Sequence, residues 1–363
     1  MTHPYISLPQ TAYWRTAVAD RDMMAVTDLW QPKFIIDATT RIATFGSCFA
    51  QHFGRELREK GFGWVNAERA PRELSDADAS VFGYNLFSAR TGNIYTTSIL
   101  KQWISWAVGA TAPPDEVWKS EERYFDPFRP MIEPNGFESI EEMHRCRSVT
   151  LSALKNLLRS SNVFVFTLGL TESWFNPAGG YEYPLCPGTI AGKFDKKSHQ
   201  FAAQSFDSVH ENLLEAIALM RSQNRNLKFL LTVSPVPLTA TNSGKHVVVA
   251  TSASKSILRA AAETVANTFD FVDYFPSYEI INSPVFKGAF FEENQRSVAP
   301  EGVAFVMKNF FDAINTSTVT KDKLPEPSTA KEEKRQNQLD HEVFCEEELL
   351  AAFAPDKDVD DRS

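Results

Sequence analysis

A turn of small residues, Gly46-Ser47-Cys48, places a hydroxyl and a thiol next to each other where chemistry is feasible. It follows the β-prone run 41–45 and precedes a helical pattern, so it joins a strand to a helix. The first N–H groups of a helix are unpaired, and the positive end of the helix dipole favours a thiolate. Cys48 is therefore a candidate nucleophile, whereas Ser47 would also need a nearby base.

Both residues also have ordinary structural interpretations. A cysteine at the start of a core-facing helix commonly serves as a small hydrophobic residue. Ser47 has a side chain suited to the helix N-cap position. The spacing alone leaves the functional and the structural interpretations open.

Three histidines are candidates for a general base beside this turn, of which His199, in a polar loop, ranks third. His52 follows Cys48 by four residues, so its side chain leans back toward the thiol, although a surface position is equally consistent with the sequence. His246 falls in a predicted loop after the third strand, and such loops carry function more often than helix faces do, so His246 ranks above His52. No spacing such as HxH or HExxH predicts a metal site, and no cofactor is expected.

The elements that position these residues follow a repeated strand-helix pattern. Phe49, Phe53 and Leu57 recur on one face of a helix over 48–60, and Gly61 ends it. Further strands are predicted at 162–167, 227–233 and 271–274, and helices at 151–158, 208–222, 254–267 and 300–314. The alternation predicts a three-layer α/β/α sandwich around a mostly parallel sheet, with sites beyond the carboxyl ends of the strands.

The chain is expected to divide into four parts. Residues 1–40 form an irregular covering segment, and residues 41–315 form the α/β domain, with a long loop-rich insertion after its first strand-helix unit. Residues 316–340 are predicted to be a polar linker. Residues 341–363 form a short tail, which packs on the domain or on another chain through an apolar patch of Val343, Phe344, Leu349, Leu350 and Phe353.

Composition excludes several classes of protein. A formal net charge of −9 argues against nucleic acid as a partner, because phosphate binding needs dense basic patches. No apolar run reaches the roughly 18 residues of a membrane span, and no secretory signal is evident, so we expect a cytoplasmic protein without membrane insertion. The 4 cysteines are scattered singly and are expected to be free thiols. The oligomeric state is left open.

Several longer strings resemble one known family over most of the chain. They are TFGSCFA at 44–50, YNLFS at 84–88, GNIYT at 92–96, FDPFRP at 125–130, LGLTESW at 168–174 and TVSPV at 232–236. These strings resemble the GSCFA family, which is grouped with the SGNH (GDSL-like) hydrolases and acyltransferases. The resemblance implies a three-layer, SGNH-like fold and acyl chemistry.

The SGNH motifs can be carried over residue by residue. The first block, Gly-Asp-Ser, aligns Cys48 with the nucleophile and Ser47 with the aspartate. The third block, Gly-x-Asn-Asp, resembles Gly169-Leu170-Thr171-Glu172, so Thr171 stands in the place of the oxyanion-hole asparagine. Gly83 and Asn85 are the implied donors from the second region.

The last SGNH block departs from the pattern. Asp-x-x-His falls near Asn294-Gln295-Arg296-Ser297, which has neither residue at the matching places. The missing pair removes the base and its orienting carboxylate, which are central to serine-type acyl transfer. Asn294 and Arg296 remain candidate substrate or oxyanion residues.

The sequence thus predicts an SGNH-like esterase or O-acyltransferase acting on a glycan or another polar acyl ester, with a nucleophile in the Gly46-Ser47-Cys48 turn. Trp174, Asn176 and Tyr181 are expected in loops, where they line a substrate groove or pack the loops onto the core. The alternative is a non-catalytic glycan- or metabolite-binding protein that has lost the Asp-x-x-His machinery.

Overall fold

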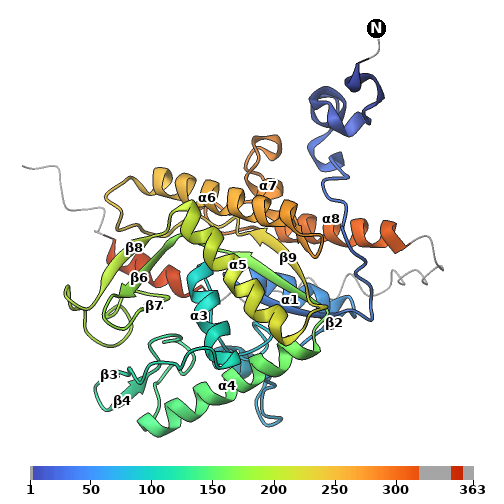
Figure 1. Ribbon diagram of the computed structural model, residues 1–363. Helices are drawn as coiled ribbons and strands as arrows, with labels where there is room; N and C mark the ends of the chain where they lie inside the picture. The colour runs from blue at the N-terminus through green and yellow to red at the C-terminus, as the bar shows by residue number, and fades with distance from the viewer. Residues whose placement is uncertain (1–2, 319–344, 355–363) are drawn as a thin grey trace, which may run out of the picture.

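The computed structural model describes residues 3–318 and 345–354. At its centre lies a five-stranded sheet, all parallel, in the order β10-β9-β5-β1-β2. Helices cover both faces of this sheet (Figure 1), so the predicted three-layer α/β/α fold is confirmed. The strands are β1 Arg41–Gly46, β2 Gly63–Trp64, β5 Val163–Leu168, β9 Lys228–Val233 and β10 Val272–Tyr274.

Each strand divides its side chains between two hydrophobic layers, as the two-residue period of a strand requires. Phe45 belongs to the layer under α3, α4, α5 and α6, whereas Ile42 belongs to the layer under α1, α7 and α8. The first set is α3 Thr97–Val108, α4 Ile140–Ser160, α5 Phe206–Gln223 and α6 Val247–Thr268. The second set is α1 Phe49–Glu59, α7 Ser277–Asn282 and α8 Pro300–Thr318.

The N-terminal segment consists of short helical turns, and its second half covers the sheet. Trp30 and Phe34 are buried in the layer formed with α1 and α8, and Trp30 stacks on Phe310. The first turns extend away from the body of the protein (Figure 1). These turns are η1 Pro4–Ser7, η2 Gln10–Ala12, η3 Arg15–Ala19 and η4 Met23–Ala25.

Two helices begin earlier than the sequence pattern indicates. α4 begins at Ile140 because Ser139 caps it, accepting the N–H of Glu142 at 3.1 Å. α6 begins at Val247 because the imidazole of His246 accepts the N–H of Val248. His246 therefore lies at the end of the predicted loop, as the N-cap residue of α6.

Several short elements lie outside the predicted pattern. A three-stranded antiparallel sheet, β7-β6-β8, follows β5 and contains Trp174, Asn176 and Tyr181, so these residues are in strands rather than loops. Its strands are too short for a periodic signal. They are β6 Glu172–Asn176, β7 Tyr181–Tyr183 and β8 Gln200–Ala203. The remaining elements are α2 Asp76–Val81, the hairpin of β3 Trp118–Ser120 and β4 Arg123–Phe125, η5 Pro284–Phe286 and η7 Glu346–Phe353.

The strand order fixes where a ligand crevice can form. From β1 the chain crosses to β2 on one side, and it later returns to β5 on the other side of β1. Such a reversal is a topological switch point, and the crevice beyond the carboxyl ends of the two central strands is the usual binding position. Gly46 at the end of β1 pairs with Thr167 near the end of β5, so the Gly46-Ser47-Cys48 turn lies at this crevice.

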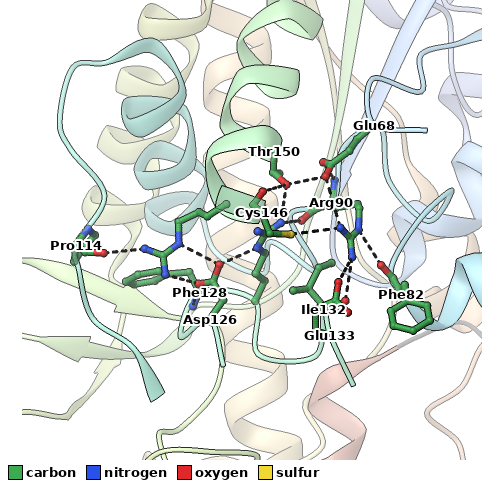
Figure 2. Close-up of polar contacts among 12 residues, drawn as sticks. Glu68, Phe82, Arg90, Pro114, Asp126, Phe128, Ile132, Glu133, Cys146 and Thr150 are labelled. Carbon is green, nitrogen blue, oxygen red and sulfur yellow. Dashed lines mark hydrogen bonds and ion pairs between the residues drawn. The ribbon is translucent and has the colours of Figure 1, made fainter. Parts of the chain in front are cut away.

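A buried ionic network holds the long insertion against α4 (Figure 2). Asp126 accepts hydrogen bonds from Arg129 at 2.9 Å and from Arg147 at 2.8 Å, and all three side chains are almost completely buried. Arg129 also donates to Thr150 on α4 at 2.6 Å. Burial alone would raise the pKa of Asp126, but Arg147 and Arg129 outweigh it and lower that pKa. The two ion pairs of Arg129 and Arg147 in this network therefore depend on one carboxylate.

Replacing that carboxylate should destabilise the fold strongly. Asp126→Asn leaves two buried guanidinium groups uncompensated, so we expect the free energy of unfolding to fall by about 3–5 kcal/mol in urea titrations. Because the pKa of Asp126 is lowered by folding, its contribution is present above the ordinary value of 3.8 and is lost as the pH falls below it. Glu122→Gln, in the exposed pair with Lys119, is the control and should leave stability nearly unchanged. Equal effects of the two substitutions would contradict this account.

Candidate active site

The Gly46-Ser47-Cys48 turn is fixed to β5 by its backbone. The N–H of Ser47 donates to the carbonyl of Thr167 at 3.1 Å, and the hydroxyl of Ser47 is buried without a described hydrogen-bond partner. The N-cap residue of α1 is Cys48, and no side chain caps this helix. The interpretation of Ser47 as the N-cap is therefore wrong. Its unpaired hydroxyl remains available to a ligand at the switch point.

The thiol of Cys48 meets a second thiol from the far end of the chain. Cys48 is 5% exposed, and its thiol interacts with the thiol of Cys345, which immediately precedes η7. Arg296 approaches the Cys345 sulfur with Nη2 at 3.8 Å, and the hydroxyl of Tyr95 lies 4.0 Å from it. The C-terminal segment 345–354 thus covers the Cys48 turn.

The pKa values of the two thiols are shifted in opposite directions. The hydrogen bond from Cys48, followed by the charge of Arg296, lowers the pKa of Cys345 to about 6. The same hydrogen bond, together with burial, raises the pKa of Cys48 well above its ordinary value. The surroundings therefore favour the thiolate on Cys345 over the thiolate on Cys48.

Lys255 adds a buried amine to this site. Its side chain is 1% exposed, and Nζ donates to the carbonyl of Gly169 at 2.8 Å. Burial lowers the pKa of Lys255 to about 8, and the nearby charges of Glu347 and Cys48 act in the opposite direction. The sequence reasoning missed this residue. The sequence does contain a signal for it, because Lys255 is a charged residue on the same helix face as the buried residues Leu258 and Ala262.

Arg296 belongs to the segment 294–297, which the sequence pattern aligns with the Asp-x-x-His block of an SGNH enzyme. Asn294 orients its loop by accepting the backbone N–H of Arg296 at 2.9 Å. The guanidinium group forms ion pairs with Glu347 at 3.4 Å and with Glu348 at 2.9 Å. Its Nε is buried without a described partner. Arg296 therefore brings a fixed positive charge, rather than a titrating base, to the two thiols.

Two buried carboxyl groups hold the C-terminal segment in place. Burial raises the pKa of Glu346 to about 8, and this side chain forms a hydrogen bond with Asn93. Burial likewise raises the pKa of Glu347 to about 7, and its carboxylate accepts the N–H of Thr239 at 2.7 Å. Because these values exceed the ordinary carboxyl pKa, the contribution of the two carboxyl groups to docking is largest at low pH and weakens as the pH rises, whereas the lowered pKa of Cys345 acts in the opposite direction.

Of the residues expected from the third SGNH block, Gly169 lies against the turn. A Cβ on Gly169 would lie 3.0 Å from the Cβ of Ser47 and 3.0 Å from the carbonyl of Tyr95. Thr171 is buried, and its N–H donates to Ser254, the neighbour of Lys255. Glu172 accepts a hydrogen bond from Thr241 at 2.8 Å, and burial raises its pKa.

Other candidates have their described contacts elsewhere. His246 is exposed at the start of α6, and none of its described contacts reaches Cys48. His52 packs its ring near Phe49, and burial followed by the charge of Arg55 lowers its pKa to about 3. Gly83 faces Ile132, and Asn85 accepts a hydrogen bond from Asn66, with no described contact to the turn. His52 lies on α1, the helix that Cys48 begins. The structure does not bring the other three residues to the thiol pair.

A cavity of about 230 Å³ lies beside the covered turn. Its wall includes Glu347 and Leu350 of the C-terminal segment, and also Leu170, which follows Gly169 directly. The other side is formed by the aromatic rings of Trp174 and Phe201 and by the carboxyl group of Glu172. The cavity offers an apolar surface with a few polar groups, as small-molecule sites usually do.

Residues 41–310 match the GSCFA family, and the chain belongs to this family. None of the curated proteins matches the chain. In the part of the chain that the structure describes, no helix has the length and apolar character to cross a membrane. No group of three or more histidine, cysteine, aspartate or glutamate side chains among the described residues could hold a metal ion.

Removing the Cys345 thiol should activate Cys48 toward alkylation. In Cys345→Ser the charge of Arg296 no longer stabilises a competing thiolate, so the pKa of Cys48 falls. We expect iodoacetamide to label Cys48 at least about tenfold faster at neutral pH, as a fall of one pKa unit gives. Peptide mass spectrometry of the reduced proteins measures the rate for each cysteine.

The remaining cysteines provide the control for this comparison. Burial raises the pKa of Cys186 to about 11, so Cys186→Ser should leave the labelling of Cys48 unchanged. In the unaltered chain Cys345 should be labelled before Cys186. An unchanged labelling rate of Cys48 in Cys345→Ser would contradict the conclusion that Cys345 raises the pKa of Cys48.

Proposed function

We propose that this protein is an esterase or O-acyltransferase that carries the acyl group on the thiol of Cys48. The observation that carries the proposal is the position of this thiol, at the switch point of the sheet and among Lys255, Arg296 and the start of α1. A nucleophile, a titratable amine and a fixed cation in one buried site are the parts that acyl transfer needs.

In the proposed reaction, the Cys48 sulfur attacks the carbonyl carbon of an acyl ester while neutral Lys255 takes the thiol proton. The tetrahedral intermediate then collapses, the ester C–O bond breaks, and the leaving alcohol receives the proton from Lys255. Water or an acceptor hydroxyl next attacks the thioester, with Lys255 again as base, and the thiol is released. A base with a pKa of about 8 is close to neutral pH, where acid-base catalysis is most effective.

The developing oxyanion has two sources of stabilisation. Among the described contacts, the N–H groups of Cys48 and Phe49 have no acceptor and can donate to an acyl oxygen at Cys48, whereas those of Ala50 and Gln51 are taken up by the carbonyls of Ser47 and Cys48. The guanidinium group of Arg296 adds a positive charge near the two thiols. Together these groups replace part of what the missing Asp-x-x-His block would supply, with Lys255 in the role of the base.

The adjacent cavity supports a polar acyl ester, such as an acylated glycan, as the substrate class. Trp174 and Phe201 provide faces on which a sugar ring or an acyl chain can pack, and Glu172 can accept hydrogen bonds from hydroxyl groups. The shared wall residue Glu347 and the neighbouring Leu170 connect this cavity to the thiol site. The proposed substrate would place its acyl group at Cys48 and its polar part in the cavity.

Pre-steady-state hydrolysis of a p-nitrophenyl ester under reducing conditions tests the proposal. We expect a burst of p-nitrophenol approaching one equivalent per active site, because the acyl group accumulates on Cys48. Cys48→Ala should abolish the burst. Lys255→Met should slow it by about 10²- to 10⁴-fold, the usual contribution of a general base.

Controls separate chemistry from folding. Cys146→Ala, at a position outside the cavity lining, should retain the burst. Lys255→Arg should be as slow as Lys255→Met, because an arginine keeps the charge without acting as a base. Near-ultraviolet circular dichroism checks that each variant is folded. If the folded protein gives no burst with Cys345 intact or replaced by serine, the acyl-transfer proposal is contradicted and the non-catalytic binding alternative gains support.

A further inference from the structure

The contact between Cys48 and Cys345 distinguishes these two residues from the other cysteines. All four cysteines are free thiols in the structure. Cys146 lies near the guanidinium group of Arg90, and Cys186 contacts the carbonyl of Pro187. Cys48 and Cys345, by contrast, are both buried, and their two thiols interact with each other. Among the described contacts, this is the only pairing of two thiols.

We propose that Cys48 and Cys345 are a redox modification site, at which a reversible disulfide fastens segment 345–354 over the Cys48 turn. The formation of this disulfide does not depend on the proposed acyl transfer. Its effect on activity does rest on that proposed function, because the disulfide would consume the nucleophile. Thiol pairs of this kind serve as redox sensors in compartments where structural disulfides are rare.

The docked segment already places the two sulfur atoms within reach of each other. The N–H of Glu347 donates to the hydroxyl of Tyr95 at 3.3 Å, while its carboxylate binds the N–H of Thr239. Arg296 contacts both Glu347 and Glu348. These contacts lie directly beside Cys345 and hold its thiol in the cluster of side chains that surrounds Cys48.

The chemistry can be written with hydrogen peroxide as the oxidant. The Cys345 thiolate attacks a peroxide oxygen, the O–O bond breaks, and the hydroxide that leaves is protonated to water. The sulfur of Cys48 then attacks the Cys345 sulfenic acid, the S–S bond forms, and the S–O bond breaks with loss of a second water that carries the Cys48 proton. In sum, two thiols and one peroxide give one disulfide and two waters. A dithiol reverses the modification by thiol–disulfide exchange.

Arg296 directs the first step to Cys345. Its guanidinium group lies 3.8 Å from that sulfur and stabilises the thiolate, which is the form that reacts with peroxide. Cys48 then acts as the resolving thiol from within hydrogen-bond reach. The same cation is the group around which Glu347 and Glu348 dock, so oxidation is expected when the segment is in place.

Peptide mapping without reduction tests the proposal. The reduced full-length protein is treated with increasing hydrogen peroxide, quenched by alkylation, and digested. We expect a cross-linked peptide pair joining Cys48 to Cys345, which dithiothreitol separates. Cys345→Ser should lose the cross-link, and the double substitution Cys146→Ser with Cys186→Ser should retain it. Arg296→Gln should need several-fold more peroxide to reach half oxidation.

Two outcomes would overturn the proposal. One is a set of disulfides that joins other cysteine pairs with equal yield. The other is oxidation of Cys345 to sulfinic acid in the folded protein without any cross-link to Cys48. Because the mapping needs no substrate, it distinguishes failure of the disulfide from failure of acyl transfer. If both proposals hold, peroxide should abolish the p-nitrophenol burst, and dithiothreitol should restore it.

Discussion

The close approach of two backbone turns determines the geometry of the site. Gly46 has a φ of +135°, and a Cβ on this residue would lie 2.3 Å from the carbonyl of Thr167. Gly169 packs with similarly little space against Ser47 and the backbone of Tyr95. Only residues without a side chain allow β1 and β5 to end side by side in this way. Cys48, Lys255 and the start of α1 take their positions from that packing.

The electrostatics of the site follow from burial around this packed edge. Lys255 and Arg296 bring positive charge, whereas Cys345 and the carboxyl groups of Glu346 and Glu347 compete for protons. In this covered state the surroundings favour the negative charge on Cys345 over Cys48. The C-terminal segment therefore both completes the polar surroundings of Cys48 and restrains its reactivity. Withdrawal of the segment would leave Cys48 as the remaining thiol for the two cations to stabilise.

The local features of this fold were predictable from the sequence, because they depend on neighbouring residues. The strand at 41–45, the small-residue turn and the helix carrying Phe49, Phe53 and Leu57 all have short-range signals, and the structure contains each of them. The parallel sheet also followed from the alternation of apolar runs and helices. His246 was ranked as a base in a loop, whereas it caps α6, because the start of that helix has no strong apolar period.

The partners of Cys48 were not predictable, since they come from distant parts of the chain. Cys345 lies in a region with a polar composition before it, and nothing in its spacing relates it to the first strand. Tyr95 occurs in a string that resembles the GSCFA family, but its contact with segment 345–354 depends on the tertiary fold. Lys255 carried the one readable signal, a charged residue on an apolar helix stripe. Contacts of this kind require three-dimensional placement before their chemistry can be assessed.

Peptide mapping of the acylated protein tests the central claim most directly. The reduced protein is mixed with an activated acyl ester, quenched in acid within a single turnover, digested, and analysed by mass spectrometry with and without hydroxylamine. The account predicts a hydroxylamine-labile acyl group on the peptide that contains Cys48, at higher occupancy in Cys345→Ser. An acyl group on Ser47 or elsewhere, or no acyl group on a folded protein whose Cys48 can be alkylated, would contradict it.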